Sequence, residues 1–235
     1  MEVGLPEHMG YDRGITIFSP DGRLYQVEYA RQAVEKATTT VGVTFKEGAI
    51  LGAIKVSMPL LVPESSRKIY KIDEHIGTAA CGLIADSKVL IDFARVEAQK
   101  HKMTYNEPME VKSLVKKISL KKQIYTQYGG TRPFGVSLLL IGMNKTPHLF
   151  ETDPSGTMRE WYAHSLGRGS SVARKILEKE YKQNMSEDSA MKLVVKCLRE
   201  SEKKLSKDNV EFGIVKNGKF KLFSKDEVGK ILRSY

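Results

Sequence analysis

The sequence predicts an α+β protein in which two antiparallel sheets pack face to face and helices cover both outer surfaces. Two observations predict this four-layer αββα sandwich. Blocks of strand-like runs are separated by pairs of amphipathic helical segments. Within each block, short turns join successive strands, which is typical of antiparallel hairpins. No linker or repeat interrupts the 235 residues, so we expect one domain over residues 13–235 behind a flexible tail of residues 1–12.

The first predicted helix covers about residues 21–36, with its core running from Arg23 to Lys36. It follows a turn at residues 19–22, in which proline presets φ and glycine is free to take a positive φ. Either Ser19 or Asp21 is available as the N-cap. The apolar stripe of this helix consists of Leu24, Val27, Ala30 and Val34.

Two hairpins and two helices are predicted next. The strands cover residues 39–45, 49–56, 68–72 and 76–81, and the helices cover 85–100 and 110–125. Val89, Phe93 and Val96 share one face of the first helix. In the second, the pairs 116–117 and 121–122 are all lysine and lie opposite the apolar stripe, so we expect a solvated face there.

The last part of the chain repeats this alternation. Strands are predicted over 135–143, 148–151 and 158–165, followed by helices over 170–181 and 186–203, with Ser186 as the cap of the second. A hairpin over 211–215 and 219–223 turns at Asn217-Gly218, a strong hairpin signal, and a short helix follows.

The composition indicates a globular protein without a nucleic-acid or membrane partner. There are 38 Lys and Arg residues against 28 acidic ones, giving +10, but the charges are interleaved and indicate a solvated surface. No apolar run approaches the ~20 residues of a membrane span. The first residues lack a secretory signal pattern, and Cys81 and Cys197 lie in apolar runs typical of buried thiols. We therefore expect a cytoplasmic protein.

No cofactor or metal site is predicted. Gly167-Arg168-Gly169 lies between a strand and a helix, but Val172 stands where a dinucleotide loop needs its third glycine, so a tight turn is the better interpretation. The five histidines are isolated from one another and show no metal-ligand spacing.

The run of threonines from Thr38 to Thr40 resembles the start of a mature N-terminal threonine hydrolase. Such a threonine needs a free α-amine as its base, an acid about sixteen residues on and a lysine about thirty-two on. Those positions hold Ile54 and Tyr70, and only Lys71 stands near the second. No acid occurs between residues 48 and 63, so a β-branched strand start is the better interpretation.

Several long motifs resemble the α subunits of the 20S proteasome core, the non-catalytic branch of the N-terminal nucleophile hydrolase fold. The resemblance begins at Tyr11-Asp12-Arg13 and continues through residues 18–30, FSPDGRLYQVEYA. It extends through 82–86, GLIAD, 128–135, YGGTRPFG, and 153–156, DPSG. It covers the chain from about residue 11 to the C-terminus and looks archaeal in type.

The resemblance implies a heptameric, homomeric outer ring that stacks on proteasome β subunits and controls the passage of unfolded protein substrates. A closed ring requires different patches on the two flanks of each subunit. The N-terminal helix would be retained where β subunits remove a propeptide. The residues implied in holding the tail at the gate are Tyr11, Asp12, Arg13, Pro20 and Tyr29.

The resemblance also implies a pocket for the C-terminus of a hexameric ATPase or similar activator. Lys68 would bind the carboxylate, with Leu24, Leu83 and Ala37 around it. The loop Tyr128-Gly129-Gly130-Thr131 would line the pore. Ala37 departs from the family's usual glycine and Thr131 from its usual apolar residue.

Two alternatives differ from this hypothesis in what they predict. A catalytic threonine hydrolase unmasked at Thr38 would lose residues 1–37. An unrelated basic binding protein would form no ring.

Overall fold

Two five-stranded antiparallel sheets form the centre of the molecule in the computed structural model, which describes residues 14, 16–202 and 204–235. One sheet has the order β10-β9-β2-β1-β8 and the other β3-β4-β5-β6-β7. The strands are β1 Thr40–Phe45, β2 Gly48–Ile54, β3 Ile69–Asp73, β4 Ile76–Gly82, β5 Val136–Met143, β6 Pro147–Thr152, β7 Met158–Glu160, β8 Ala163–Leu166, β9 Val210–Lys216 and β10 Lys219–Leu222.

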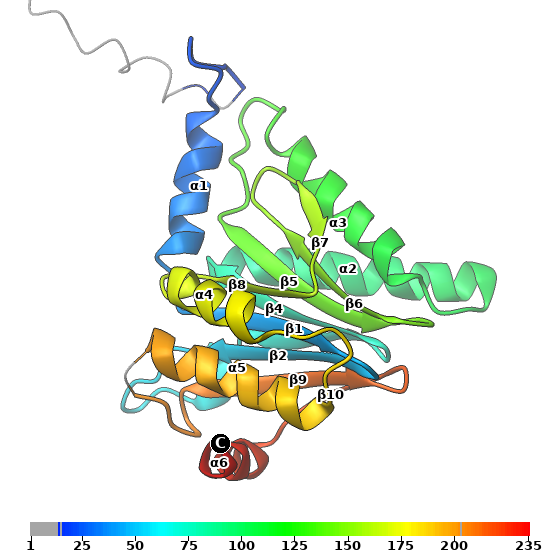
Figure 1. Ribbon diagram of the computed structural model, residues 1–235. Coiled ribbons are helices and arrows are strands. Elements are labelled where there is room, and N and C mark those ends of the chain that lie inside the picture. Colours follow the sequence, from blue (N-terminus) through cyan, green and yellow to red (C-terminus); the bar gives the residue numbers. More distant parts are fainter. Residues whose placement is uncertain (1–13, 15, 203) are drawn as a thin grey trace, which may run out of the picture.

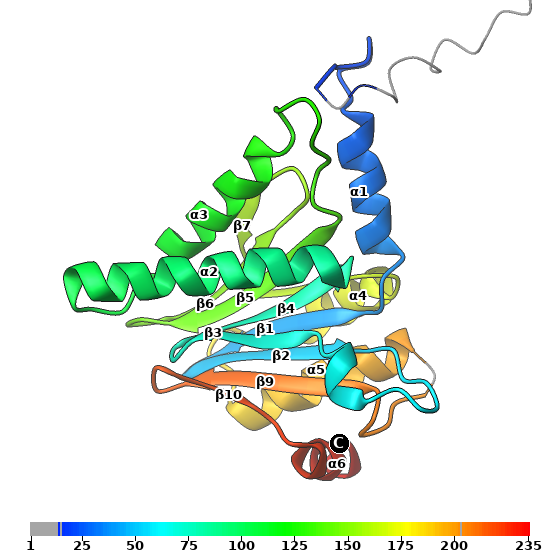
Figure 2. The same ribbon diagram turned by 180° about the vertical axis from the view of Figure 1, so that it is seen from behind.

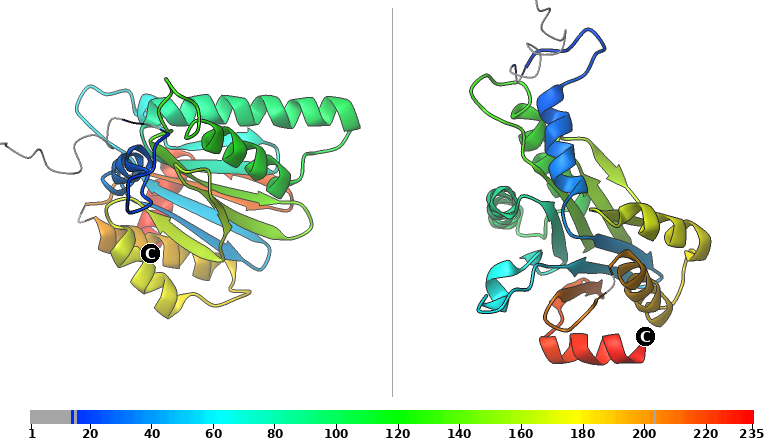
Figure 3. Two further views of the ribbon diagram at one scale, coloured as in Figure 1. Left: turned by 90° about the horizontal axis from the view of Figure 1, so that it is seen from above. Right: turned by 90° about the vertical axis from the view of Figure 1, so that its left-hand side faces the viewer.

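Helices cover the outer face of each sheet, giving the predicted αββα order (Figures 1 and 3). The helices are α1 Tyr25–Glu35, α2 Ile84–Tyr105, α3 Val111–Ile124, α4 Ser170–Glu180, α5 Glu187–Ser201 and α6 Lys225–Ser234, with a 3-10 turn η1 at Pro63–Ser66. The β3–β7 sheet carries α2 and α3, and the other sheet carries α4 and α5 (Figure 3). Helix α1 stands at one end of the sandwich (Figure 2).

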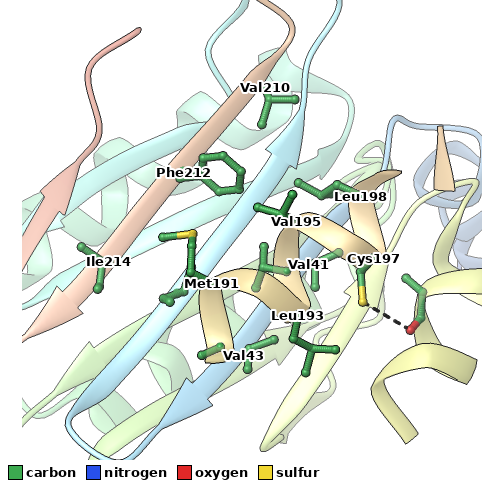
Figure 4. Packing of buried hydrophobic residues seen from close by; sticks show 14 of the residues in the cluster. Val41, Val43, Met191, Leu193, Val195, Cys197, Leu198, Val210, Phe212 and Ile214 are labelled. Carbon is green, nitrogen blue, oxygen red and sulfur yellow. Dashed lines mark hydrogen bonds between the residues drawn. The ribbon is translucent and has the colours of Figure 1, made fainter. Parts of the chain in front are cut away.

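The four layers follow from strands that are buried on both faces. Along β5, Leu138 and Leu140 pack toward α2 and α3, while Leu139 and Ile141 pack between the sheets. Three apolar clusters result, one at each interface between layers; Figure 4 shows the one between α5 and its sheet. Burial of apolar surface on both sides of each sheet is what holds the layers together.

Most predicted elements are present within a few residues of their predicted bounds. Ser186 caps α5 as predicted, accepting a hydrogen bond from Ser189 N at 3.2 Å. The N-cap of α1 is Leu24, which has no side-chain cap bond, so the prediction of Ser19 or Asp21 was wrong. Ser19 Oγ instead accepts from Arg23 N at 3.1 Å and closes the turn that precedes the helix.

The single strand predicted over residues 158–165 is two strands, β7 and β8, that belong to different sheets. The chain changes sheet between them. Trp161 N donates to Leu149 O of β6 at 2.9 Å, while Tyr162 O accepts from Thr44 N of β1 at 2.8 Å. The alternating pattern could not show this change, because both strands are extended and only the partner differs.

Of the three residues predicted to share one face of α2, Phe93 packs against the core, whereas Val89 and Val96 are about half exposed. The apolar residues that the helix buries are Leu90, Ile91, Ala94 and Ala98. Alanines allow α2 to lie close to the sheet, and hydrophobicity alone understates their value at such a contact. In the described part of the chain, no helix is long and apolar enough to cross a membrane.

Lys122 is fully buried, so the prediction that all four lysines of α3 are solvated was wrong for this residue. Its ammonium donates to Val136 O at 3.0 Å, Thr152 O at 2.9 Å and Thr152 Oγ1 at 2.8 Å. Burial lowers the pKa of Lys122 to about 7. The side chain therefore links α3 to two neighbouring strands at the end of the sheet.

We expect Lys122→Met to lower the free energy of unfolding by about 2–4 kcal/mol, because it leaves buried acceptors unsatisfied. Between the folded-state pKa of about 7 and the ordinary value of 10.5, the unfolded chain binds more protons. The stability of the wild type relative to Lys122→Met should therefore increase as the pH rises through this window. Urea unfolding followed by the single tryptophan tests both statements. Lys116→Met, on the exposed face, is the control and should change neither quantity.

Candidate functional site

A buried cluster surrounds the junction between α1 and β1, where the chain enters the sandwich. The Lys68 ammonium donates to Thr38 O at 2.7 Å, to Thr38 Oγ1 at 2.9 Å and to Thr40 Oγ1 at 3.1 Å. Lys68 is 4% exposed, and burial lowers its pKa. Three oxygen acceptors occupy the three N–H donors of the ammonium, which is how a buried lysine is normally satisfied.

The geometry places a lysine beside Thr38 that counting along the sequence did not find. The count pointed to Tyr70 and Lys71, but Lys71 points outward and pairs with Glu74. Lys68, which is 30 residues after Thr38, lies beside the threonine instead. The signal available from the sequence was the family motif, which had assigned Lys68 to a different role.

The other requirements of a nucleophilic threonine are not met at Thr38. Its amine is part of the peptide bond to Ala37, directly after α1, so it cannot act as a base. Its hydroxyl donates to Ile54 O at 2.5 Å, where the acid would be needed. The cluster therefore holds two backbone segments together, and of the three groups that a nucleophilic threonine needs it supplies only the lysine.

The turn at 167–169 packs against this junction, as the tight-turn interpretation predicted. Arg168 N donates to Ala37 O at 2.9 Å, and Gly169 N donates to Thr39 Oγ1 at 3.1 Å. Gly167 has φ +92°, and a Cβ there would lie 2.8 Å from the carbonyl oxygens of residues 37 and 38. A glycine is required for so close an approach of two backbones.

The predicted pocket residues are only partly brought together within one chain. Lys68 lies next to Ala37, which is half-buried against the core between the sheets. Leu83, at the start of α2, is 47% exposed. Leu24 begins α1, whereas Ala37 follows its end, so about 16 Å of helix separates them.

The predicted pore loop follows α3 and lies at the same end of the molecule as the start of α1 (Figures 1 and 2). Tyr128 is exposed, and Gly130 takes φ +80°. Thr131 Oγ1 donates to Tyr128 O at 2.9 Å and to Tyr125 O at 3.2 Å, closing the turn with a hydroxyl. The Thr131 hydroxyl thus stabilises the backbone conformation of its own loop.

Two ion pairs that the sequence did not assign anchor this end. Arg132 donates two bonds to Asp86, of 2.6 and 2.7 Å, and Asp86 also accepts from Gly135 N at 2.9 Å. The hydrogen bond from Arg132 lowers the pKa of Asp86. Arg31 of α1 donates to Asp153 at 2.8 Å. The partners are 46 and 122 residues apart, so no local pattern could pair them.

Of the predicted gate residues, Tyr11, Asp12 and Arg13 lie outside the described residues. Pro20 is exposed in the turn before α1, and Tyr29 is 46% exposed on the helix, with its ring 6.3 Å from that of Tyr25. Among the described residues, no group of three or more His, Cys, Asp or Glu side chains could hold a metal ion.

Comparison with known proteins agrees with this geometry. The family described as "Proteasome subunit" matches residues 34–215, and the N-terminal signature of A-type proteasome subunits matches residues 11–33. The chain belongs to the proteasome subunit family. The A-type signature covers α1, which places the chain among the α subunits, the non-catalytic subunit type of the 20S core.

Archaeal proteasome α subunits are similar over nearly the whole chain. The α subunit of the Pyrococcus horikoshii proteasome is 48% identical over 231 residues, covering 97% of this chain and 89% of the relative. That of Archaeoglobus fulgidus is 54% identical over 214 residues, covering 90% and 87%. That of Methanopyrus kandleri is 46% identical over 226 residues, covering 95% and 92%.

Because Thr38 has no free amine and no acid, Thr38→Ala should leave peptide hydrolysis by particles assembled with β subunits unchanged. It removes two hydrogen bonds, so the mutated chain itself should lose about 1 kcal/mol of stability. Hydrolysis of a fluorogenic peptide, measured per particle, checks this. The chain should also keep its full mass of 26.4 kDa. Particles that assemble normally but hydrolyse no peptide would contradict the non-catalytic assignment.

Proposed function

We propose that this protein forms a homoheptameric ring that controls access to a proteolytic chamber made by β subunits. The observation that carries the proposal is the position of the Tyr128–Thr131 loop beside the start of α1 at one end of the molecule (Figures 1 and 3). In a ring, this end would face the axis of every copy. The tail, residues 1–12, and the loop would then meet around one pore.

The anchoring of this end supports a gate role. Arg132 and Asp86 fix the base of the loop on α2, and Arg31 and Asp153 fix α1 on the turn between β6 and β7. A rigid rim lets a tail attached to α1 be the only moving part. Tyr11, Asp12, Arg13, Pro20 and Tyr29 are proposed to position that tail, and residues 13–235 to form the single domain behind it.

Lys68 is proposed to receive the C-terminal carboxylate of a hexameric ATPase activator, with Ala37, Leu83 and Leu24 of the same or a neighbouring copy around it. Its three donors are already occupied by Thr38 and Thr40. A carboxylate must therefore replace at least one of these oxygens, which links activator binding to the end of α1. Charge-assisted bonding to a carboxylate favours this exchange over a neutral acceptor.

We place the assembly in the cytoplasm, acting on unfolded protein that passes through the pore, without a nucleic-acid or membrane partner and without a cofactor. Cys81 and Cys197 are buried free thiols, which suits a reducing compartment.

Deletion of residues 2–12 should increase peptide hydrolysis by assembled particles severalfold, because it removes the proposed obstruction from the pore. Rates are measured per active site by titration with a covalent inhibitor of the β subunits. A folded protein substrate should remain uncut, because the loop rim is intact. An unchanged peptide rate would contradict the gate role of the tail.

Lys68→Met should abolish stimulation by the activator while the ring still assembles and basal peptide hydrolysis continues. The substitution keeps much of the side-chain volume and removes the cation that binds the carboxylate. It also leaves the buried Thr38 carbonyl and Thr40 hydroxyl without the Lys68 donor, so the mutated chain should lose stability as Lys122→Met does. Stimulation is therefore compared only among particles that native mass spectrometry shows to be assembled. Lys71→Met, on the neighbouring strand with its side chain exposed, is the matched control and should keep full stimulation. Full stimulation of the Lys68→Met particle would exclude Lys68 as the carboxylate partner.

A further inference from the structure

The loop between β2 and η1 exposes a run of large apolar side chains. Val56 is 52% exposed, Met58 56%, Leu60 104% and Val62 62%. Scattered exposed apolar residues are ordinary on a protein surface. Four within seven consecutive positions are a local concentration, and concentrations of exposed apolar side chains mark surfaces that other molecules cover.

The backbone of this loop is strained at the most exposed residue. Leu60 has φ +69°, and among the described residues every other non-glycine residue with positive φ is an asparagine. Asparagine can offset the cost of this backbone conformation with local side-chain hydrogen bonds, whereas the apolar side chain of leucine cannot. Strain of this kind is concentrated at functional segments.

The base of the loop is held rigidly by a buried ion pair. Lys55 Nζ donates to Pro63 O at 2.9 Å and lies 3.3 Å from Glu211. The other carboxylate oxygen of Glu211 accepts from Lys68 N at 2.9 Å and from Ile69 N at 3.1 Å. Both ends of the segment that carries the loop are therefore tied to Glu211 of β9, which limits where the apolar side chains can lie.

An aromatic groove of about 600 Å³ lies at the opposite end of the same sheet. Its apolar wall is made by Phe45, Pro147, Trp161, Tyr162 and Tyr181. The rings of Tyr162 and Tyr181 stack at 6.2 Å, and Tyr162 is 63% exposed. Exposed, stacked tyrosines beside a tryptophan are the composition of binding hot spots.

The loop and the groove of one chain cannot meet. β2 starts at Gly48 beside the groove and ends at Ile54 beside the loop, which separates them by about 20 Å of strand. In Figure 2 the loop, in cyan, projects from one end of the strands, and the hairpin ends lie at the other. A head-to-tail ring requires such unlike patches at opposite ends of each copy.

One pair of opposite charges is available between the two ends. Glu64 is exposed beside the loop, and Lys46 is exposed at the groove, whose acidic residue Glu160 is already paired with His148. In the part of the chain that the structure describes, neither Glu64 nor Lys46 forms an ion pair. Opposite charges at the rim of an interface favour one orientation of approach.

We propose that the loop of residues 56–62 in one copy inserts into the aromatic groove of the next copy, with Leu60 as the central apolar contact. This inference rests on the proposed homomeric ring and identifies its lateral contact. It also explains the strain at Leu60 and the exposure of Tyr162, which have no role within the isolated chain.

Cysteine cross-linking of the assembled ring tests the contact. The double variant Leu60→Cys/Tyr162→Cys, treated with a short bis-maleimide, should give a ladder of covalent oligomers that reaches the full ring size. Each single variant should give no covalent dimer, because a head-to-tail contact never places the same residue of two copies together. The native Cys81 and Cys197 are buried and should not react. Leu60→Cys/Leu120→Cys, with its second cysteine exposed on α3, is the matched control and should give no ladder.

Native mass spectrometry separates failure of this inference from failure of the ring. An intact wild-type ring of about 185 kDa, for about seven copies, with no ladder in the double variant would overturn the loop contact and leave the ring standing. Covalent dimers from Leu60→Cys alone would overturn it too, since they require a symmetric contact. A wild-type chain that forms no ring would overturn both. Leu60→Asp should raise the dissociation constant of the ring at least tenfold, and Val172→Asp, exposed on α4, should not.

Discussion

The Lys68 ammonium at the junction of α1 and β1 is the contact on which the rest of the functional architecture depends. It holds the Thr38 carbonyl and hydroxyl and the Thr40 hydroxyl at one point, where α1 leads into β1. A buried charge is tolerated only when oxygens replace the water it loses. Here those oxygens come from the continuous chain that leads out of α1. Because the chain is continuous from α1 to Thr38, the same segment supplies these oxygens to Lys68 and keeps the amine of Thr38 within a peptide bond.

Long-range ion pairs anchor α1 and the Tyr128–Thr131 loop to the rest of the molecule. Arg31 and Asp153 tie α1 to the β6–β7 turn, and Arg132 and Asp86 tie the Tyr128–Thr131 loop to the start of α2. Each acid also accepts backbone N–H bonds, from Thr157 and Gly135 respectively, so it fixes a loop as well as a partner side chain.

Two different surfaces at the ends of the strands distinguish one flank of the molecule from the other. A loop with four exposed apolar side chains lies on one side and an aromatic groove on the other, so the two flanks are unlike. Glu211 accepts one hydrogen bond from Lys55, at the start of the loop of residues 56–62, and another from the backbone N–H of Lys68. The proposed activator site and the proposed lateral contact are therefore both anchored by Glu211. A neighbouring copy that seats on the loop would thus also complete the surroundings of Lys68.

The sequence by itself determined the fold class, nearly every helix and strand, and membership of the α type, because periodicity, turn residues and a long N-terminal motif are local signals. Tertiary structure decided what depends on distant partners. In the sequence, Lys122 is indistinguishable from the other three lysines of α3. It can be buried only because Val136 and Thr152 provide acceptors for its ammonium. The sequence pattern predicts one strand over residues 158–165, but the segment forms two strands because their pairing partners lie in different sheets. Lys68 stands beside Thr38 because two strands of different sheets begin at the same end of the sandwich, a proximity that no spacing along the chain encodes.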